Sequence, residues 1–458
     1  MNASSTYPMN AWSEFAAPLA STVTEAPSAG GSPWGTTIVA LFFFVVVALI
    51  GWAMASPKDR KWLPVVVIVA FIAKLIGSTA RYLVLVLVYH GRGDATGYHG
   101  AGLRISESWR SFEVPTTVQR IGTDVVEAIT GLLYVPYQPS MLGGFYIFAS
   151  LAFLGQLLLY AAFRHSLPER HLKWYAAAIF FSPTIVYWPS SIGKEALMLL
   201  WIGIASYGAA RLLANYNPAW AGVILIGLAG SGIIRLHMTL LLSAGMVLAL
   251  LLARAPRVTA PQARRLLLLG AASVALVLVV LLTAQDFGVD LAAAASADSA
   301  TDEVGEVFAQ VEGQTDKGGS AVSGGAVTSP ADVPEAILRV IFRPLPNEAD
   351  TAPLLVASLE GTLLLLIFVV RLPWIIGNLR HLRRYPYLMY AFFYSGGFIL
   401  AFSAILNLGI LARQRSQVMP FFLALMIVLG RKHVEEAVEP APAPEPVPAP
   451  RPLELVRG

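Results

Sequence analysis

Long apolar runs separated by short polar stretches cover most of this chain. About 20 apolar residues are enough for an α-helix to cross the hydrocarbon core of a bilayer, and runs of this length indicate helices rather than strands. The pattern predicts an all-α protein, a polytopic transmembrane helical bundle of about eleven spans. The predicted spans are residues 36–55, 63–89, 141–163, 175–188, 196–213, 219–234, 238–253, 266–284, 353–370, 386–411 and 418–430.

One polar stretch between two of these runs is unusual. Residues 187–195 read Tyr-Trp-Pro-Ser-Ser-Ile-Gly-Lys-Glu, which places Lys194 and Glu195 after a run that is short for a span. A helix broken by Pro and Gly at membrane depth persists only where protein or a water-filled cavity satisfies its backbone. We therefore expect this hinge to form part of the floor of a hydrated, extracytoplasmic cavity.

The composition supports a membrane protein and excludes several functions. The 458 residues are 56% hydrophobic and 13% charged, whereas soluble domains carry about a quarter charged residues. The absence of cysteine excludes disulfides, thiol nucleophiles and thiolate zinc sites. No nucleotide-binding glycine motif is present, and the histidines lack the spacing of a zinc protease. The net charge of +4 reflects basic loops and does not indicate nucleic-acid binding.

The positions of Lys and Arg predict the orientation of the chain, because short cytoplasmic loops are enriched in these residues. If the amino terminus lies outside, every short cytoplasmic loop is basic, and the carboxyl terminus is cytoplasmic. The predicted parts are a disordered polar leader (1–35), a transmembrane domain (36–430) with long outer loops at 91–140 and 285–352, and a disordered Pro-rich cytoplasmic tail (434–458).

On this topology, polar side chains from separate loops face the outside together. Polar groups placed between spans are costly unless they serve a cavity, so their convergence indicates a functional site. The candidate residues are Asp94, Tyr98, His99, Lys194, Glu195, Arg235, His237, Arg343, Glu348, Asn407, Arg413 and Arg415.

Asp94, His99 and Glu195 are the candidate catalytic residues. Asp94 stands in a Gly-rich turn at residues 91–100, where a carboxylate beside flexible backbone suits a general base for a sugar hydroxyl. A surface loop capped by Asp explains the same pattern equally well, and Glu195 also suits the positive end of the helix that follows it. A zinc site is not predicted, whereas oxygen-ligated Mg²⁺ or Mn²⁺ at Asp94 stays open.

The basic residues are candidate phosphate ligands. Lys194 opposes the dipole of the helix that it begins and therefore calls for an anion nearby. Arg413 and Arg415 offer planar, bidentate recognition of phosphate. For these two residues and for Arg235, the alternative is an interfacial side chain that reaches lipid headgroups.

Three further charged residues lie within predicted spans. Lys74 and Arg81 are seven residues apart and share one helix face, and Glu360 lies about two turns inside the ninth predicted span. An intramembrane charge is a functional hypothesis by default. A buried structural ion pair, such as Arg81 with Glu360, explains them at least as well.

Four short stretches resemble bacterial integral-membrane glycosyltransferases and repeat-unit polymerases, of the GT-C type and the O-antigen-polymerase-like type. They are residues 93–99, 181–195, 343–348 and 407–415. The resemblance implies cell-envelope or exopolysaccharide synthesis in the bacterial plasma membrane. It further implies a donor sugar carried by polyprenyl phosphate or pyrophosphate and transferred to a glycan acceptor on the outer face.

The resemblance also implies roles for individual residues. Asp94 would be the base, although it is a single acid where GT-C proteins often have a pair, and it follows the second predicted span instead of the first. Repeat-unit polymerases rely more on Arg than on an acidic base. The implied phosphate ligands are Lys194, Arg235, Arg413 and Arg415, and the remaining substrate-binding candidates are Tyr98, His237, Arg343, Glu348 and Asn407.

Two other classes of function explain the same pattern. A transporter or flippase could move a lipid-linked glycan or another anion through a cationic cavity, although the chain has no convincing internal repeat. A scaffold for an envelope-synthesis complex would tolerate neutralisation of all the outward charges.

Overall fold

The computed structural model describes residues 33–113, 122–215, 219–253, 327, 329–349, 351–405 and 407–430. These ranges contain helices and no β-strand, which confirms the all-α prediction for this part of the chain. Five of the described helices are long and apolar enough to cross a membrane, and three shorter apolar helices accompany them. This is a membrane protein, and the total of eleven spans stays a prediction.

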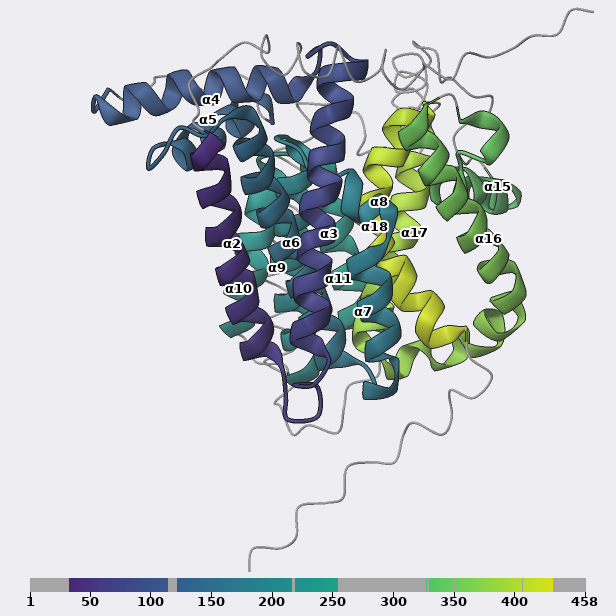
Figure 1. The fold of residues 1–458 in the computed structure, drawn as a ribbon. Helices are drawn as coiled ribbons and strands as arrows, with labels where there is room; N and C mark the ends of the chain where they lie inside the picture. Colours follow the sequence, from purple (N-terminus) through teal and green to yellow (C-terminus); the bar gives the residue numbers. More distant parts are fainter. Residues whose placement is uncertain are drawn as a thin grey trace, which may run out of the picture.

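The described helices stand mostly upright, side by side, with α4 lying across one end (Figure 1). The first half comprises α2 (Pro33–Met54), α3 (Leu63–Leu83) continued by η1 (Val84–Val88), α4 (Asp94–Arg110), α5 (Thr123–Tyr134), α6 (Met141–Ser166), η2 (Glu169–His171), α7 (Leu172–Phe181), α8 (Pro183–Tyr187) and α9 (Lys194–Asn215). The second half comprises α10 (Ala219–Gly232), α11 (Leu236–Leu252), η3 (Pro330–Asp332), α15 (Val333–Ile337), η4 (Leu338–Phe342), η5 (Pro346–Glu348), α16 (Ala352–Asn378), η6 (Leu379–Arg384), α17 (Pro386–Phe402) and α18 (Leu408–Leu429).

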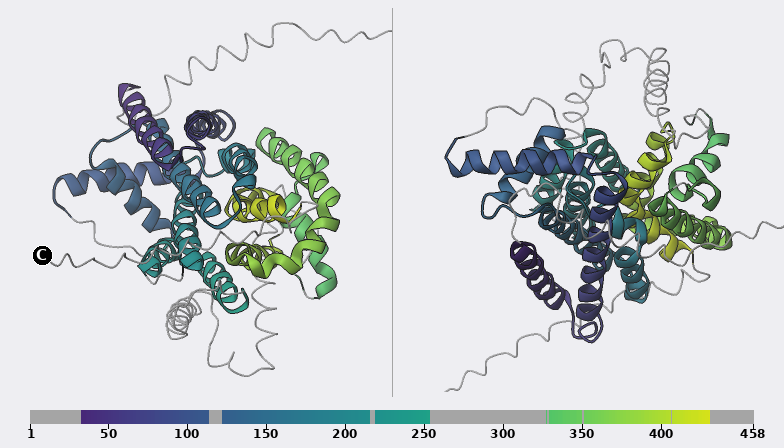
Figure 2. Two further views of the ribbon diagram at one scale, coloured as in Figure 1. Left: turned by 90° about the horizontal axis from the view of Figure 1, so that it is seen from below. Right: turned by 45° about the horizontal axis from the view of Figure 1, so that its top comes forward.

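Helices α6 and α9 form the centre of the bundle through close backbone contact. A methyl group added at Gly155 would lie 2.3 Å from the Leu199 carbonyl oxygen, and one at Gly203 would lie 2.5 Å from the Gly155 carbonyl oxygen. Small residues allow this approach, which is how helices associate in lipid, where burial of apolar surface drives little. Around this pair, α18 contacts α7, α9 and α16, and α16 lies on the side opposite α2 (Figure 2).

Two predicted boundaries are wrong for physical reasons. The run at 175–188 is two helices, α7 and α8, because Pro183 offers no amide and drives Ser182 to an extended backbone (φ −56°, ψ 119°). The last helix begins at Leu408 instead of residue 418. The Asn407 side chain caps it by accepting from the Ile410 amide at 3.1 Å, so this predicted substrate ligand is a helix cap.

The predicted Gly-rich turn at 91–100 is also corrected, because helix α4 begins at Asp94 and takes up most of it. The segments predicted as long outer loops contain helices, α4 and α5 in the first and α15 with η4 in the second. The span predicted at 266–284, most of the loop at 285–352, most of the leader and the Pro-rich tail lie outside the described residues.

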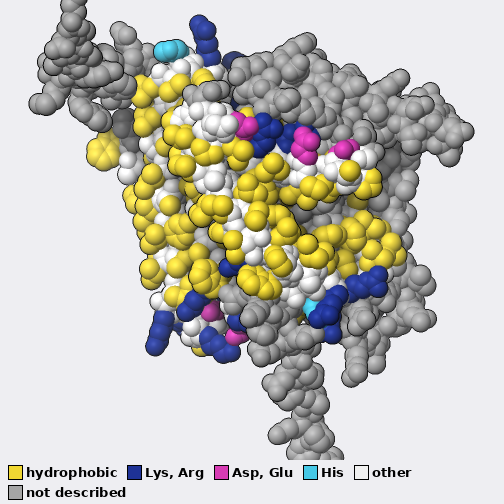
Figure 3. Space-filling view, turned by 90° about the vertical axis from the view of Figure 1, so that its right-hand side faces the viewer, with side chains coloured by type: hydrophobic (Ala, Val, Ile, Leu, Met, Phe, Trp, Pro, Cys, Tyr) yellow, Lys and Arg dark blue, Asp and Glu magenta, His cyan; other side chains and the backbone are white. Residues whose placement is uncertain are grey.

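Basic side chains gather at the end of the bundle opposite α4. The loop with Lys58, Arg60 and Lys61 comes before α3, and α4 comes after α3 and η1. This loop and α4 therefore lie at opposite ends of α3. Arg380, Arg383 and Arg384 of η6 lie at the same end as the loop (Figure 1). Figure 3 shows a broad hydrophobic band with Lys and Arg side chains gathered below it, as expected for a surface that faces lipid.

Candidate functional site

Arg235 joins the hinge to helix α18. It occupies the extended turn between α10 and α11 (φ −147°, ψ 95°). Its guanidinium donates to Glu195 Oε1 at 2.9 Å and to Gln414 Oε1 at 2.8 Å. The Arg235 and Glu195 side chains are only 13% and 14% exposed. This ion pair is therefore largely shielded from water, where the lower dielectric constant strengthens the attraction between the charges. The structure thus brings two predicted site residues together.

Lys194 is held beside this pair by the start of α5. Its Nζ donates to the Thr123 hydroxyl at 3.2 Å. The preceding Gly122 has φ +88°, and a methyl group there would lie 2.8 Å from the Ile234 carbonyl oxygen and 3.3 Å from Lys194 Nζ. Glycine is therefore needed both for its backbone angle and for space. Sequence reasoning missed Gly122 and Thr123, because a lone Gly before a helix is a weak signal.

Asp94 and Tyr98 approach the hinge from helix α4, one turn apart. Tyr98 is buried, and a methyl group added at Gly193 would lie 3.9 Å from its ring and 3.5 Å from Glu195 Oε2. Asp94 is exposed and lies within electrostatic range of Lys194. Burial, and then the Asp94 carboxylate, raise the pKa of Tyr98 above its usual value. Tyr98 is therefore a neutral hydroxyl beside the charged groups.

Arg81 and Arg413 extend the charged cluster. The Arg81 guanidinium lies 5.1 Å from the ring centre of Trp188 and 5.5 Å from that of Tyr187, within cation–π range. It is also in electrostatic range of Glu195 and Arg413. Arg413 is exposed on the first turns of α18. We call Asp94, Tyr98, Lys194, Glu195, Arg235, Arg81 and Arg413 the hinge cluster.

An apolar pocket of about 230 Å³ adjoins the hinge cluster. Helices α3, α8 and α16 line it, the last through its first turns from Ala352 to Ala357. Tyr187 and Trp188, whose rings face Arg81, are also part of its wall. The pocket and the cations therefore share one aromatic boundary.

Arg415 and Glu360 belong to a second, largely buried network behind the apolar pocket, whose Thr184 and Ala357 they contact. Arg415 is 1% exposed and donates to the carbonyl oxygens of Ile341 and Ala357 and to the Thr184 hydroxyl. Glu360 accepts from the Thr184 amide at 2.8 Å and from the hydroxyls of Thr184 and Ser182. Arg415 is thus a structural clamp, contrary to its predicted role as a phosphate ligand. Glu360 makes these contacts instead of the ion pair with Arg81 that the sequence allowed.

Four other residues have partners outside the hinge cluster, although His237 lies in electrostatic range of Arg235 and Lys74 in that of Arg81. Arg343 and Glu348 form an ion pair with each other, and Glu348 also accepts from the Leu345 amide at 2.8 Å. Burial alone would raise the pKa of Glu348, but these donors outweigh it and lower the pKa. The His237 ring packs on Phe402 with centroids 5.8 Å apart. Lys74, the remaining intramembrane cation, donates to the Ile185 carbonyl oxygen at 2.8 Å.

His99 faces away from the hinge cluster and packs between α4 and α5. It is 5% exposed, and its Nδ1 lies 3.0 Å from the Tyr134 hydroxyl. Burial lowers the pKa of His99 to about 4, so the ring is neutral at pH 7. The predicted catalytic role therefore has no geometric support.

The pH dependence of α4 provides a test of this assignment. Unfolded His99 would bind a proton near pH 6.5 but the folded ring only near pH 4, so stability falls as pH drops through that window. We expect α4 to lose about 2 kcal/mol of protection between pH 7 and pH 5. Hydrogen exchange of α4 amides, corrected for intrinsic rates, measures this loss. The His99→Phe variant should show a flat profile, and an equal slope in both proteins would contradict the assignment.

The arrangement suits an amphiphilic anion better than a metal ion. Within the described ranges, no group of three or more His, Asp or Glu residues could hold a metal. No protein-family model, curated protein or solved structure matches the chain.

Proposed function

We propose that this protein is a glycosyltransferase or polysaccharide polymerase of the bacterial plasma membrane. It would use a polyprenyl-phosphate-linked sugar donor on the extracytoplasmic face, in cell-envelope or exopolysaccharide synthesis. The observation that carries this proposal is the aromatic boundary at Tyr187 and Trp188, which joins the cation Arg81 to an apolar pocket. A ligand with a phosphate head and a hydrocarbon chain matches both sides of that boundary.

The charges of the hinge cluster suit departure of a lipid phosphate. Negative charge grows on the phosphate as the glycosidic bond breaks, and fixed cations in a poorly hydrated site stabilise it more than water does. Lys194, Arg81 and Arg413 would supply these cations. Arg235 uses two of its five N–H donors on Glu195 and Gln414, which fixes its orientation and leaves three for the phosphate.

Asp94 is the better candidate for the base that takes the proton from the acceptor hydroxyl. Glu195 is engaged by Arg235, whereas the Asp94 carboxylate is exposed. The orientation follows from the basic loops at the opposite end of α3, which we place in the cytoplasm. A divalent cation is not required by this mechanism.

Reconstitution in liposomes tests the proposed function. The purified chain is supplied with a labelled polyprenyl-phosphate sugar and a glycan acceptor, and products are separated by mass. New glycosidic bonds support the enzyme, whereas movement of the labelled lipid across the bilayer without bond change supports the transporter or flippase. If neither bond formation nor lipid movement occurs, the enzyme and the transporter are both rejected, and the scaffold is favoured.

The Arg235–Glu195 pair gives a sharper prediction. Arg235→Gln should lower transfer about 100-fold, because removing one donor to a developing anion typically has this effect. Initial rates are measured for Arg235→Gln, Glu195→Gln and the double variant. The double variant should stay as slow as Arg235→Gln. Recovery of its rate to about the wild-type value would mean that Arg235 serves only to neutralise Glu195.

A further inference from the structure

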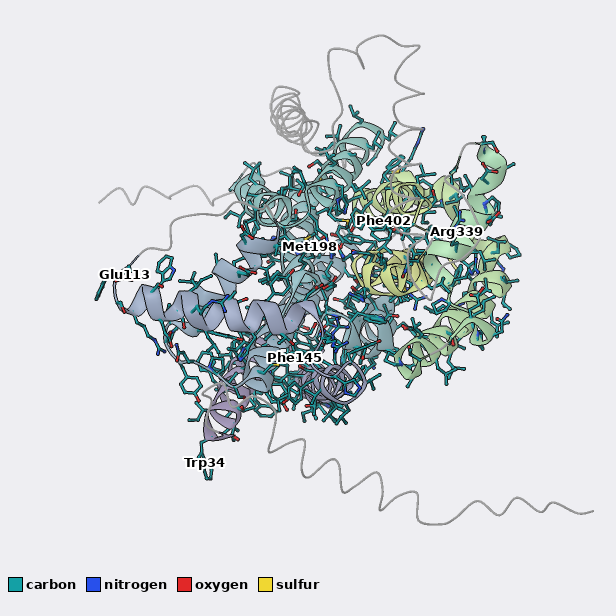
Figure 4. The ribbon with its side chains drawn as sticks, turned by 90° about the horizontal axis from the view of Figure 1, so that it is seen from above. Trp34, Glu113, Phe145, Met198, Arg339 and Phe402 are labelled. Atoms are coloured by element: carbon teal, nitrogen blue, oxygen red, sulfur yellow. The ribbon has the colours of Figure 1, made fainter. Side chains whose placement is uncertain are left out.

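Helix α4 extends beyond the edge of the helix bundle. Viewed from above, its far end near Glu113 projects past the start of α2 at Trp34 (Figure 4). Figures 1 and 2 show the same overhang from the side and from below. α2 is one of the helices long and apolar enough to span a membrane. The far end of α4 therefore lies at the height where the bilayer surface meets this side of the protein.

The end of α4 presents a bulky aromatic residue in an unusual backbone conformation. The Phe112 amide donates to the Trp109 carbonyl oxygen at 3.1 Å, and the Glu113 amide donates to the Ser108 carbonyl oxygen at 2.8 Å. These two bonds form a Schellman motif, whose left-handed position is usually Gly. Here it is Phe112, with φ +59° and a side chain that is 95% exposed. A bulky residue is disfavoured in this region, and no packing inside the protein compensates for it.

Contacts with α5 hold the far end of α4 in place. Arg110 donates to the carbonyl oxygens of Val135 at 2.8 Å and Tyr134 at 3.2 Å, which fastens the end of α4 to the end of α5. Trp109 beside it is 42% exposed. Trp34, at the start of α2, is 78% exposed. Exposed aromatic rings, with Arg104 exposed on the same helix as Phe112 and Trp109, are typical of the interface between lipid headgroups and acyl chains.

We propose that the far end of α4 is a membrane anchor that inserts Phe112 and Trp109 into the headgroup region of the adjacent lipid leaflet. Lipid is the occupant that fits, because the overhang leaves the bundle at the end where the spanning helix α2 begins (Figure 1) and carries both exposed rings and an exposed cation. The anchor holds α4 parallel to the bilayer. It thereby sets the height of Asp94, at the other end of the same helix, above the membrane surface. This inference stands whether or not the protein transfers sugars.

The absence of cysteine allows a direct test by single-site labelling. Phe112→Cys carries an environment-sensitive fluorophore in nanodiscs that hold one chain each. Glu107→Cys is the matched control, because Glu107 is exposed and lies about 200° around the helix from Trp109. We expect nitroxide lipids labelled near the headgroup to quench the label at 112 but not that at 107, and aqueous iodide to do the reverse.

The other outcomes overturn the anchor. Quenching of the label at 112 by iodide places this residue in water. Protection from both quenchers means that protein covers this residue instead of lipid. A second variant, Phe112→Gly, keeps the left-handed helix end and removes the ring. Hydrogen exchange at the end of α4 should become at least tenfold faster in nanodiscs for Phe112→Gly, and unchanged or slower exchange contradicts the proposal.

Discussion

Replacing Arg415 by Met is expected to prevent accumulation of stably folded protein. The change removes the donors to Ile341, Ala357 and Thr184. It also deprives the half-buried Glu360 carboxylate of the Arg415 charge, with which it interacts. Breaking one side of a buried charged network costs about 3–5 kcal/mol, a large share of the total stability of about 5–15 kcal/mol.

Fluorescence-detected size-exclusion chromatography with heating measures this loss. Arg413→Met is the matched control, since Arg413 lies two positions away on the same helix and is exposed. It should keep the wild-type unfolding temperature even if transfer is lost. An unfolding temperature for Arg415→Met within about 2 °C of wild type would show that the network contributes little to the fold.

Replacing Asp94 by Asn is expected to lower sugar transfer by about 10²- to 10⁴-fold, the range that a general base contributes. Asn has the same size and also suits the start of a helix, so the fold of α4 should persist. Glu107→Gln is the control, because it removes another exposed carboxylate from the same helix. Initial rates with saturating donor measure the effect. A rate near wild type for Asp94→Asn would remove this residue from the mechanism.

The convergence at the hinge could be predicted from the sequence because it depends on polarity alone. Lys194, Glu195 and Arg235 interrupt apolar runs, and a chain in a membrane gathers such groups away from lipid. Their pairing could not be predicted, since it depends on how α9, α10 and α5 pack. Thr123 and Gly122 illustrate this, because their importance arises only from contact with Lys194 and the α10–α11 turn.

Arg413 and Arg415 show where reasoning from hydropathy fails. The polar triplet Arg-Gln-Arg lowers the apolar signal, so a loop was expected where helix α18 has already begun. Residues two apart on a helix point in nearly opposite directions. One of these arginines therefore faces the hinge cluster, and the other is buried against η4, α8 and α16. The place of Arg81 in the hinge cluster could not be predicted either, because its aromatic partners Tyr187 and Trp188 are far away in the sequence.

The break between α7 and α8 also constrains how the protein is made. The break leaves the backbone amide of the buried Thr184 to donate to Glu360, 176 residues later, and the Thr184 hydroxyl to accept from Arg415, 231 residues later. When α7 and α8 leave the ribosome, neither partner has been synthesised. The polar groups at the α7–α8 break must therefore be kept away from acyl chains until α18, the last described helix, is inserted. Truncation before α18 would leave an insertion intermediate, a natural substrate for membrane quality control.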